Sequence, residues 1–414
     1  MRRLLVFAVI FTALSVTTAR AELYFGGFLQ GLYGGRTDDT NPTATEYTAS
    51  ETRLQLRMEH FGDNAEFFGR LDFFYDAAVA PQYDWELREG YAKFRLGSKI
   101  DVKVGRQILT WGTGDLIFIN DVFAKDYRSF FIGRDDQYLK APQDAVRMAW
   151  YNPIGELSIA WTPRFEPNRL PTGQRLSFYN PMAGGIIGTQ AQGMPLEPEA
   201  KFDNSEIASR LSRRFGFYTA ALYFYRGFYK NPVGFDPNAQ AAYYPELNVY
   251  GASIRGMLMG GILWLEGGYM HSRDDEDGDN PYVPNSTIEG LFGYEKQIAS
   301  NLTANLQWQV EYMQDYETFE SQQMPGSQYR DELYHLLTSR ITKLMMRELL
   351  TLSGFIFYSP SDEDLYLRLM AEYKYTDEVI LAVGANIFDG EYESTEFGQF
   401  QKNDNLYAKI TYGF

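Results

Sequence analysis

Charged side chains recur at alternate positions within apolar segments of this chain, and that spacing is the first indication of chemistry. In residues 365–375, Arg368, Glu372 and Lys374 share one parity, while leucine, alanine and tyrosine hold the other. Residues 302–312 alternate in the same way, with Thr, Asn, Gln and Glu opposite Leu, Ala, Trp and Val. Because successive side chains of a strand point to opposite faces, each segment has one apolar and one polar face. Clustered guanidinium groups on such a polar face favour carboxylate or phosphate groups of a solute.

The same alternation along the chain assigns one set of charged residues to the polar face. The basic members are Arg53, Arg57, Arg70, Lys93, Arg95, Arg147, Arg210, Arg255, Arg340 and Arg368, and the acidic members are Glu289, Glu295 and Glu311. The basic residues concentrate in the first half of the chain, whereas the glutamates form a later arc. If these faces line a pore, the resulting transverse field would orient charged or dipolar solutes. The alternative is a network of salt bridges that only stiffens the wall.

The elements that position these residues are about eighteen alternating segments of roughly ten residues, the length of a tilted transmembrane strand. Their connectors alternate between short and long, and the short ones are rich in Gly, Asn, Asp and Pro, the residues of tight turns. A Lys or Arg facing lipid would cost about 2–4 kcal/mol near mid-membrane, so the polar face must enclose a lumen. The sequence therefore predicts an all-β fold, a transmembrane antiparallel β-barrel of about 18 strands, with short periplasmic turns and long extracellular loops.

Composition and the chain ends agree with this prediction. Residues 1–21 have two arginines, a short apolar run and an Ala-Arg-Ala site, which predicts a signal peptide, so 22–414 forms one barrel domain. Aromatic residues make up 16% of the chain, as expected for belts at two membrane interfaces. Cysteine is absent, which excludes disulfides and thiolate metal sites. The formal net charge of −16 argues against binding of nucleic acid.

Two stretches carry a resemblance to known proteins. The alternating segment Leu406–Phe414 ends on an aromatic residue, and in this it resembles the closing strand of Gram-negative outer-membrane β-barrels. Gly105-Arg106-Gln107, followed by Trp111-Gly112 and by an Asn-Asp…Lys-Asp segment at 120–126, resembles porin-like families that include alginate-export-type barrels. The resemblance implies an outer-membrane porin and suggests that the loop Ile108–Gln143 folds inward to narrow the pore.

That loop supplies a set of candidate constriction residues: Arg106, Gln107, Asp115, Asp121, Lys125, Arg128 and Arg134. Strict alternation from Val102 and Val104 would place Arg106 outward, so its inward position requires a bulge at Gly105. The alternative is an exposed loop whose motif serves folding.

Catalytic and metal chemistry find little support in the residues. His60, His271 and His335 have no readable nucleophile or ligand spacing, and the adjacent Ser272 and His271 would point to opposite faces of a strand. The acidic run at 274–279 lacks the glutamate at position 12 that an EF-hand needs. We therefore expect no enzyme activity, no catalytic residue, no metal site and no cofactor.

The sequence thus predicts a channel for passive diffusion of small hydrophilic solutes, with an anionic preference as the finer hypothesis. Expected partners are outer-membrane lipid, lipopolysaccharide and the barrel-assembly machinery, while a homo-oligomer or a periplasmic partner stays open. One rival is a barrel sheath around a partner such as a periplasmic multihaem cytochrome, which would carry all of the haem. A second rival is an adhesin that acts through the long loops.

Overall fold

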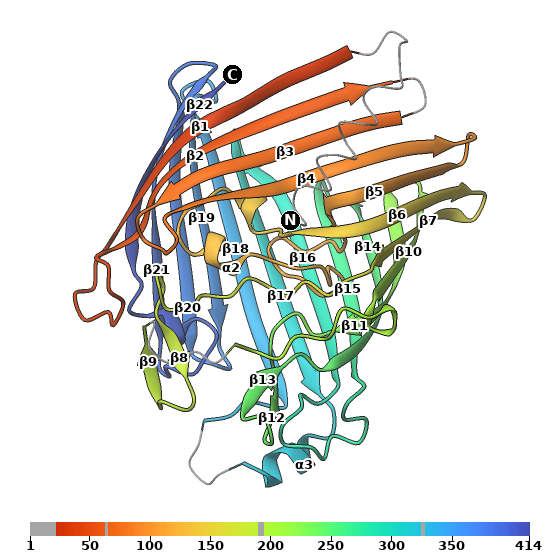
Figure 1. Ribbon diagram of the computed structural model, residues 1–414, viewed down its shortest axis with the longest axis vertical. Helices are drawn as coiled ribbons and strands as arrows, with labels where there is room; N and C mark the ends of the chain where they lie inside the picture. The colour runs from red at the N-terminus through yellow and green to blue at the C-terminus, as the bar shows by residue number, and fades with distance from the viewer. Residues whose placement is uncertain (1–21, 63–64, 189–193, 324–327) are drawn as a thin grey trace.

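The barrel is a single antiparallel sheet that closes on itself, because its first strand pairs with its last (Figure 1). The computed structural model describes residues 22–62, 65–188, 194–323 and 328–414; the predicted signal peptide, residues 1–21, lies outside them. The 18 strands of the sheet are β1 (Glu22–Arg36), β2 (Tyr47–Phe61), β3 (Ala65–Asp76), β4 (Tyr83–Leu96), β5 (Ile100–Ile108), β6 (Pro142–Asn152), β7 (Gly155–Thr162), β10 (Glu206–Phe215), β11 (Tyr218–Phe228), β14 (Glu246–Leu258), β15 (Gly261–Ser272), β16 (Thr287–Ala299), β17 (Leu302–Met313), β18 (Leu333–Met345), β19 (Leu350–Ser359), β20 (Asp364–Lys374), β21 (Val379–Gly390) and β22 (Asn405–Gly413). The predicted fold class and strand number are confirmed.

The remaining elements are small and lie in the loops. They are the strand pairs β8 (Phe178–Asn180) with β9 (Gly185–Ile187) and β12 (Gly234–Asp236) with β13 (Ala241–Tyr243), the helices α2 (Tyr127–Phe130) and α3 (Tyr316–Ser321), and the 3-10 turns η1 (Asp136–Tyr138), η3 (Phe202–Asn204) and η4 (Gly398–Phe400). No helix in the described ranges has the length and apolar character to cross a membrane.

The two faces of the sheet follow the alternation read from the sequence. On β17 the outward residues Leu306 and Trp308 are 56% and 46% exposed, whereas Gln307 between them is fully buried. On β22, Leu406 and Ile410 are outward and exposed, and Tyr407 and Lys409 point inward and are buried. An apolar exterior around a polar interior is the arrangement that a lipid bilayer requires of a barrel.

Short turns gather at one end of the barrel and long loops at the other. The short connectors include 97–99, 153–154, 259–260 and 300–301, and the long ones include 109–141, 163–205, 229–245 and 314–332. Gly97 in the first of these turns has φ +62°, a conformation that glycine adopts at little cost. We refer below to the short-turn end, which we expect to be periplasmic, and the long-loop end, which we expect to be extracellular.

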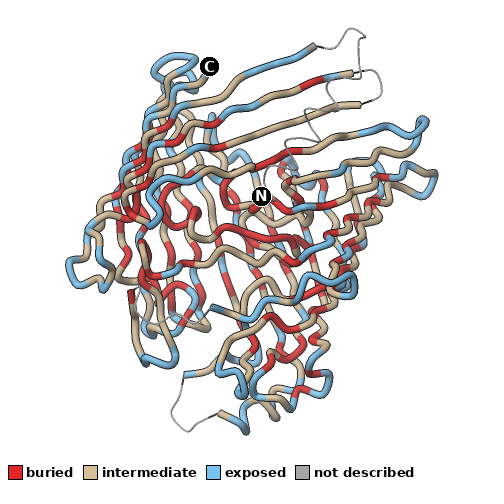
Figure 2. The backbone as a smooth tube through the Cα atoms, in the orientation of Figure 1, coloured by how far each residue is buried: buried red, intermediate tan, exposed pale blue. Residues whose placement is uncertain are grey.

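The longest buried segment is not part of the wall. Residues 109–141 between β5 and β6, here called the inner loop, cross the barrel interior, where Figure 2 shows buried backbone running between the walls. Ile119, Phe130, Ile132 and Leu139 of this loop are at most 5% exposed and belong to one cluster with wall residues. The hydrophobic core of the protein therefore lies inside the lumen, between the inner loop and the strands.

Candidate functional site

The inner loop is held across the lumen by polar contacts to strands far along the chain. Asp115 accepts a hydrogen bond from Asn305 Nδ2 (2.7 Å) on β17 and forms an ion pair with Arg340 (3.0 Å) on β18. The amide of Asp115 donates to Gln307 Oε1 at 2.8 Å, and Gln307 Nε2 donates back to the Asp115 carbonyl at 2.8 Å. These contacts fix the first part of the loop against the wall opposite β5.

Glu266 on β15 is the second anchor of this part. Its buried carboxylate accepts hydrogen bonds from the backbone N–H (2.5 Å) and hydroxyl (2.7 Å) of Thr113. It also accepts from the backbone N–H (2.8 Å) and side-chain amide (3.0 Å) of Asn120. A buried carboxylate is costly unless its lone pairs are satisfied, and here the loop backbone satisfies them.

The second half of the inner loop is tied to the barrel seam and its neighbours. Asp136 pairs with Arg368 of β20 at 2.5 Å, and Asp135 pairs with Lys409 of β22. Arg134 pairs with Glu51 of β2. The loop is thereby fixed around most of the barrel circumference.

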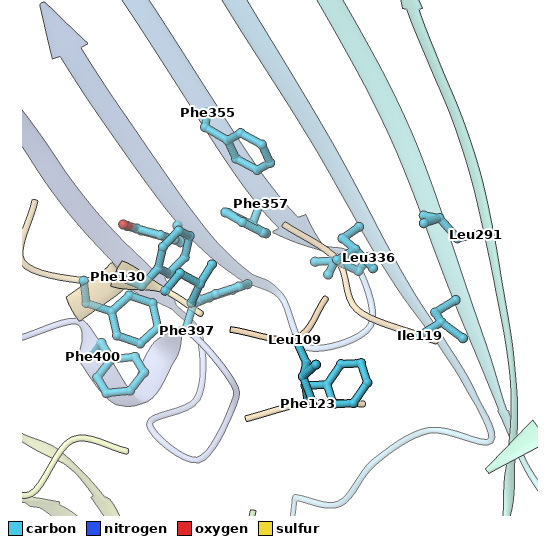
Figure 3. Close-up of a cluster of buried hydrophobic side chains, with 14 of the residues drawn as sticks. Leu109, Ile119, Phe123, Phe130, Leu291, Leu336, Phe355, Phe357, Phe397 and Phe400 are labelled. Carbon is cyan, nitrogen blue, oxygen red and sulfur yellow. The ribbon is translucent and has the colours of Figure 1, made fainter. Parts of the chain in front are cut away.

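Aromatic rings fill the space between the inner loop and β19–β22. Phe131 lies 4.7 Å from Phe400 and 5.5 Å from both Tyr366 and Phe388, measured between ring centroids. Phe130 packs on Phe357 at 6.0 Å, and Figure 3 shows Phe130 beside Phe397 and Phe400. These contacts fill the space between the loop and that side of the barrel wall.

Buried charges inside the loop support its shape. Lys125 is fully enclosed, pairs with Asp121 at 3.1 Å and donates to the carbonyls of Asp121 and Phe123. Burial lowers the pKa of Lys125, although Asp121 opposes this. Burial alone would raise the pKa of Asp126, yet Arg128 and Arg169 lower it to about 2, so this carboxylate stays ionised.

On the wall formed by β4–β10, cations lie next to one another on neighbouring strands. Lys93 of β4 pairs in register with Lys103 of β5, and Lys103 pairs in register with Arg147 of β6. Arg147 Nε donates to Ser158 Oγ (3.0 Å), and Ser158 is the register partner of Arg210 on β10. We call Lys93, Lys103, Arg147 and Arg210 the basic row. Like charges directly opposite one another destabilise a sheet, which indicates that this row serves a purpose other than stability.

Counter-ions for the basic row are incomplete. Lys93 has Glu66 at 3.2 Å, but Lys103 reaches Glu89 only at 4.0 Å, and Arg147 reaches Glu156 only at 3.9 Å. Arg210 forms no ion pair with any residue of the described chain and packs 5.9 Å from the Tyr223 ring. The row therefore keeps a net positive charge on the lumen face.

A separate cavity lies between the inner loop and β14–β18. It has a volume of about 600 Å³ and is lined by Arg255, Arg340, Asp115, Trp264, Glu295 and several Thr, Asn and Gln side chains. Arg255 is exposed there, lies over the Trp264 ring at 5.4 Å and has no acidic partner among the described residues. This polar cavity can hold a hydrated small solute between a cationic and an acidic group.

Acidic side chains gather nearer the long-loop end. Glu289 of β16 and Glu311 of β17 are direct register partners, and Arg330 pairs with Glu311 at 2.6 Å. In the neighbouring turn between β19 and β20, burial first and Asp364 second raise the pKa of Asp362 to about 6. The described part of the chain contains no group of three or more His, Cys, Asp or Glu residues arranged to hold a metal ion.

Several predicted pore-lining residues lie elsewhere than in an open lumen. Arg53 is 2% exposed beneath the inner loop, paired with Glu51 (2.8 Å) and Asp72 (2.6 Å), and Arg368 is 9% exposed. For these two, the salt-bridge alternative is correct, because the loop covers them. Arg57, Arg70 and Arg95 also have carboxylate partners, in Glu59, Glu89 and Asp101 respectively.

Among the predicted constriction residues, Asp115 alone lines the cavity described above. Gln107, Asp121, Lys125 and Arg134 are at most 8% exposed and form the internal frame of the loop, while Arg128 is partly exposed beside Asp126. The inward fold of the loop was predicted, but most of its charges hold it together rather than face a solute.

The expected bulge at Gly105 is wrong. Both neighbours of β5 keep continuous register through this residue, and the irregularity lies in β4 at Arg88, since Arg70 pairs with Glu89 and Leu71 with Leu87. Arg106 therefore stays on the outward face. There it pairs with Asp144 (3.1 Å). Its two terminal guanidinium nitrogens donate to the two carboxylate oxygens of Glu166 (3.0 and 3.1 Å).

Some residues of the site were not predicted. Lys103 could have been found, because it alternates with the outward Val102 and Val104 in the same way as the other lumen cations. Glu266, Asp144 and Glu166 could not have been assigned their roles, since their partners lie far away in sequence or on a loop of unknown path.

Comparisons with known proteins agree on the fold. No family model and no curated protein matches the sequence. Among solved structures, the chain is similar to OccK3 (OpdO) of Pseudomonas aeruginosa, with a TM-score of 0.57, 10% identity and coverage of 95% of this chain and 96% of that one. OccAB4 and OccAB3 of Acinetobacter baumannii give TM-scores of 0.56 and 0.54 at 12% identity, covering 95% of this chain and 98% and 99% of theirs. These neighbours are outer-membrane porins, and the likeness shows that the chain has a porin fold.

Proposed function

We propose that this protein is an outer-membrane channel for the passive diffusion of small hydrophilic solutes, with a preference for anionic, carboxylate-bearing ones. The barrel fold, its apolar exterior and its porin neighbours support the channel. The single observation that carries the anionic preference is the basic row, in which Lys93, Lys103 and Arg147 are direct cross-strand partners.

The proposed path runs along the basic row, past the inner loop and into the cavity at Arg255. Because the inner loop and its aromatic contacts fill the β19–β22 side, the proposed path of a solute passes close to these cations. Arg210 and Arg255 have no carboxylate partners in the described chain, so each guanidinium can donate two parallel hydrogen bonds to a solute carboxylate. The inner loop sets the size limit, and the row sets the charge preference.

The rival functions receive no comparable support. A sheath around a cytochrome needs an empty lumen, whereas the inner loop and the core cluster occupy this one. An adhesin acting through its loops would not require like-charged residues in register inside the barrel. The absence of enzyme activity stays a prediction from the sequence.

The test is the ion selectivity of a triple variant, Lys103→Gln/Arg147→Gln/Arg210→Gln, refolded and inserted into a planar bilayer. In a KCl gradient we expect the reversal potential to shift toward that of potassium, because three lumen cations are removed. Arg213→Gln is the matched control, since Arg213 lies on the same strand as Arg210 but on the outward, exposed face. A reversal potential that stays at the wild-type value in the triple variant would exclude the basic row as the source of selectivity.

A further inference from the structure

Arg226 is an arginine without an ion pair in the described chain, and it lies on the lipid-facing side of the barrel rather than in the lumen. Arg226 lies on β11 two residues before the strand reaches the long-loop end. It shares its parity with Leu222, which is 61% exposed on the outside, and is itself exposed. Its register partners are Ile207 and Asn248, and its side chain has no ion pair or hydrogen bond within the described chain.

Aromatic rings mark the membrane boundary directly beside Arg226. One step toward the membrane centre, the outward rings of Phe224 and Tyr250 pack at 5.4 Å. Along the same row, Trp161 is the register partner of Ile207 and packs on Phe202 at 6.2 Å. Aromatic girdles lie at the level of the lipid headgroups, and an arginine just beyond them can extend its guanidinium into that layer.

Arg106 shows what the protein does when it neutralises an outward arginine itself. Arg106 also faces outward near the long-loop end, and there the chain supplies Asp144 and a bidentate Glu166. Arg226 receives no such carboxylate from the described part of the chain, although its side chain is exposed. A guanidinium at headgroup depth without a protein anion is matched to an anion from the membrane.

We propose that Arg226, with the aromatic rings below it, binds a phosphate group of an outer-leaflet glycolipid. The guanidinium donates two parallel hydrogen bonds to phosphate oxygens, a geometry that lysine cannot reproduce. Phe224 and Tyr250 contact the adjoining acyl chains. The site would fix one lipid at the β10–β14 side of the barrel.

The experiment is native mass spectrometry of the full barrel in detergent, titrated with bisphosphorylated lipid A and, separately, with dephosphorylated lipid A. We expect the wild type to bind the bisphosphorylated form, and Arg226→Gln to weaken this binding about tenfold, as the loss of one charge-assisted contact implies. Arg226→Lys should lie between the two. Inorganic phosphate at the same concentration should not compete, because it lacks the acyl chains.

The matched control is Arg213→Gln, which removes another exposed outward arginine, one strand away and at the short-turn end. An equal loss of lipid A binding in this control would overturn the proposal, since any outward arginine would then suffice. Equal binding of phosphorylated and dephosphorylated lipid A, or no effect of Arg226→Gln, would overturn it as well. Heat-modifiable migration on gels verifies that each variant is folded, which is expected because the Arg226 side chain is exposed.

Discussion

The carboxylate of Glu266 should decide whether the first half of the inner loop stays in place. Glu266→Ala removes the acceptor of four hydrogen bonds, from the backbone and side chains of Thr113 and Asn120. A hydrogen bond to a charged group contributes about 1.5–3 kcal/mol, and water can replace part of the set in the shortened side chain. If two of the four hydrogen bonds are lost without replacement, the free energy that holds the loop at this site falls by about 3–6 kcal/mol. The population in which these loop contacts are open then rises roughly 10²- to 10⁴-fold.

The effect should be confined to the residues on either side of Asp115, because Asp115 keeps its contacts with β17 and β18. The ion pairs of Arg134, Asp135 and Asp136 hold the rest of the loop. We therefore expect Glu266→Ala to fold as a barrel but to show brief open sublevels and a higher mean conductance in single-channel records. Limited proteolysis should cut between residues 110 and 121 faster than in the wild type. Glu295→Ala is the control, because Glu295 lines the cavity beside the loop and has no hydrogen bond or ion pair with the described residues of the loop. Unchanged current noise together with unchanged cleavage in Glu266→Ala would refute this account of the loop.

Three further outcomes follow from the structure. Phe131→Ala should destabilise the packing of the inner loop on β20–β22 by about 3–5 kcal/mol, as hydrogen exchange of residues 127–139 would reveal. Burial and the neighbouring Asp364 raise the pKa of Asp362 to about 6, so the folded turn keeps a proton there that the unfolded chain releases above its ordinary pKa near 3.8. The stability of the turn at residues 359–364 should therefore fall as pH rises from about 4 to 6 and stay constant above, and Asp362→Asn should abolish this dependence in hydrogen exchange. Arg255→Gln should lower the inhibition of current by small dicarboxylates without changing the fold, as blocking titrations would measure.

The barrel could be predicted from the sequence because its two determinants are local. Alternation follows from strand geometry within ten residues, and the sorting of connectors into short and long needs no knowledge of tertiary contacts. The predicted strand Leu365–Tyr375 is β20 at Asp364–Lys374, displaced by one residue at each end. The terminal strand at Leu406–Phe414 is β22 with its apolar and polar faces as expected.

The exposure of lumen charges could not be predicted, because it depends on where the inner loop runs. Arg53 and Arg147 have the same parity signal, yet the loop covers Arg53 with Tyr138 and leaves Arg147 partly open. The contact between Asp115 and Arg340 spans 225 residues, and no local pattern encodes it. Whether a lumen arginine forms part of the frame or part of the path is thus a long-range property.

The error at Arg106 has a local cause that the sequence does not display. Glycine at 105 is required because a Cβ there would lie 2.3 Å from the Gly90 carbonyl oxygen, and its φ of +125° suits glycine alone. This is a close approach of two strands and not a bulge. The bulge lies on the neighbouring strand at Arg88, whose residue type gives no signal for it.

The central claim is that a positive lumen face inside an acidic protein makes the channel prefer anions. The most direct measurement is the reversal potential of single wild-type channels in KCl gradients at 1 M and at 0.1 M mean salt. The Debye length is about 3 Å at 1 M salt and about 10 Å at 0.1 M, so the lumen charges act on passing ions over a longer distance at low salt. We predict a chloride preference that grows as the salt is lowered. A preference for potassium, or a reversal potential independent of salt concentration, would contradict the account.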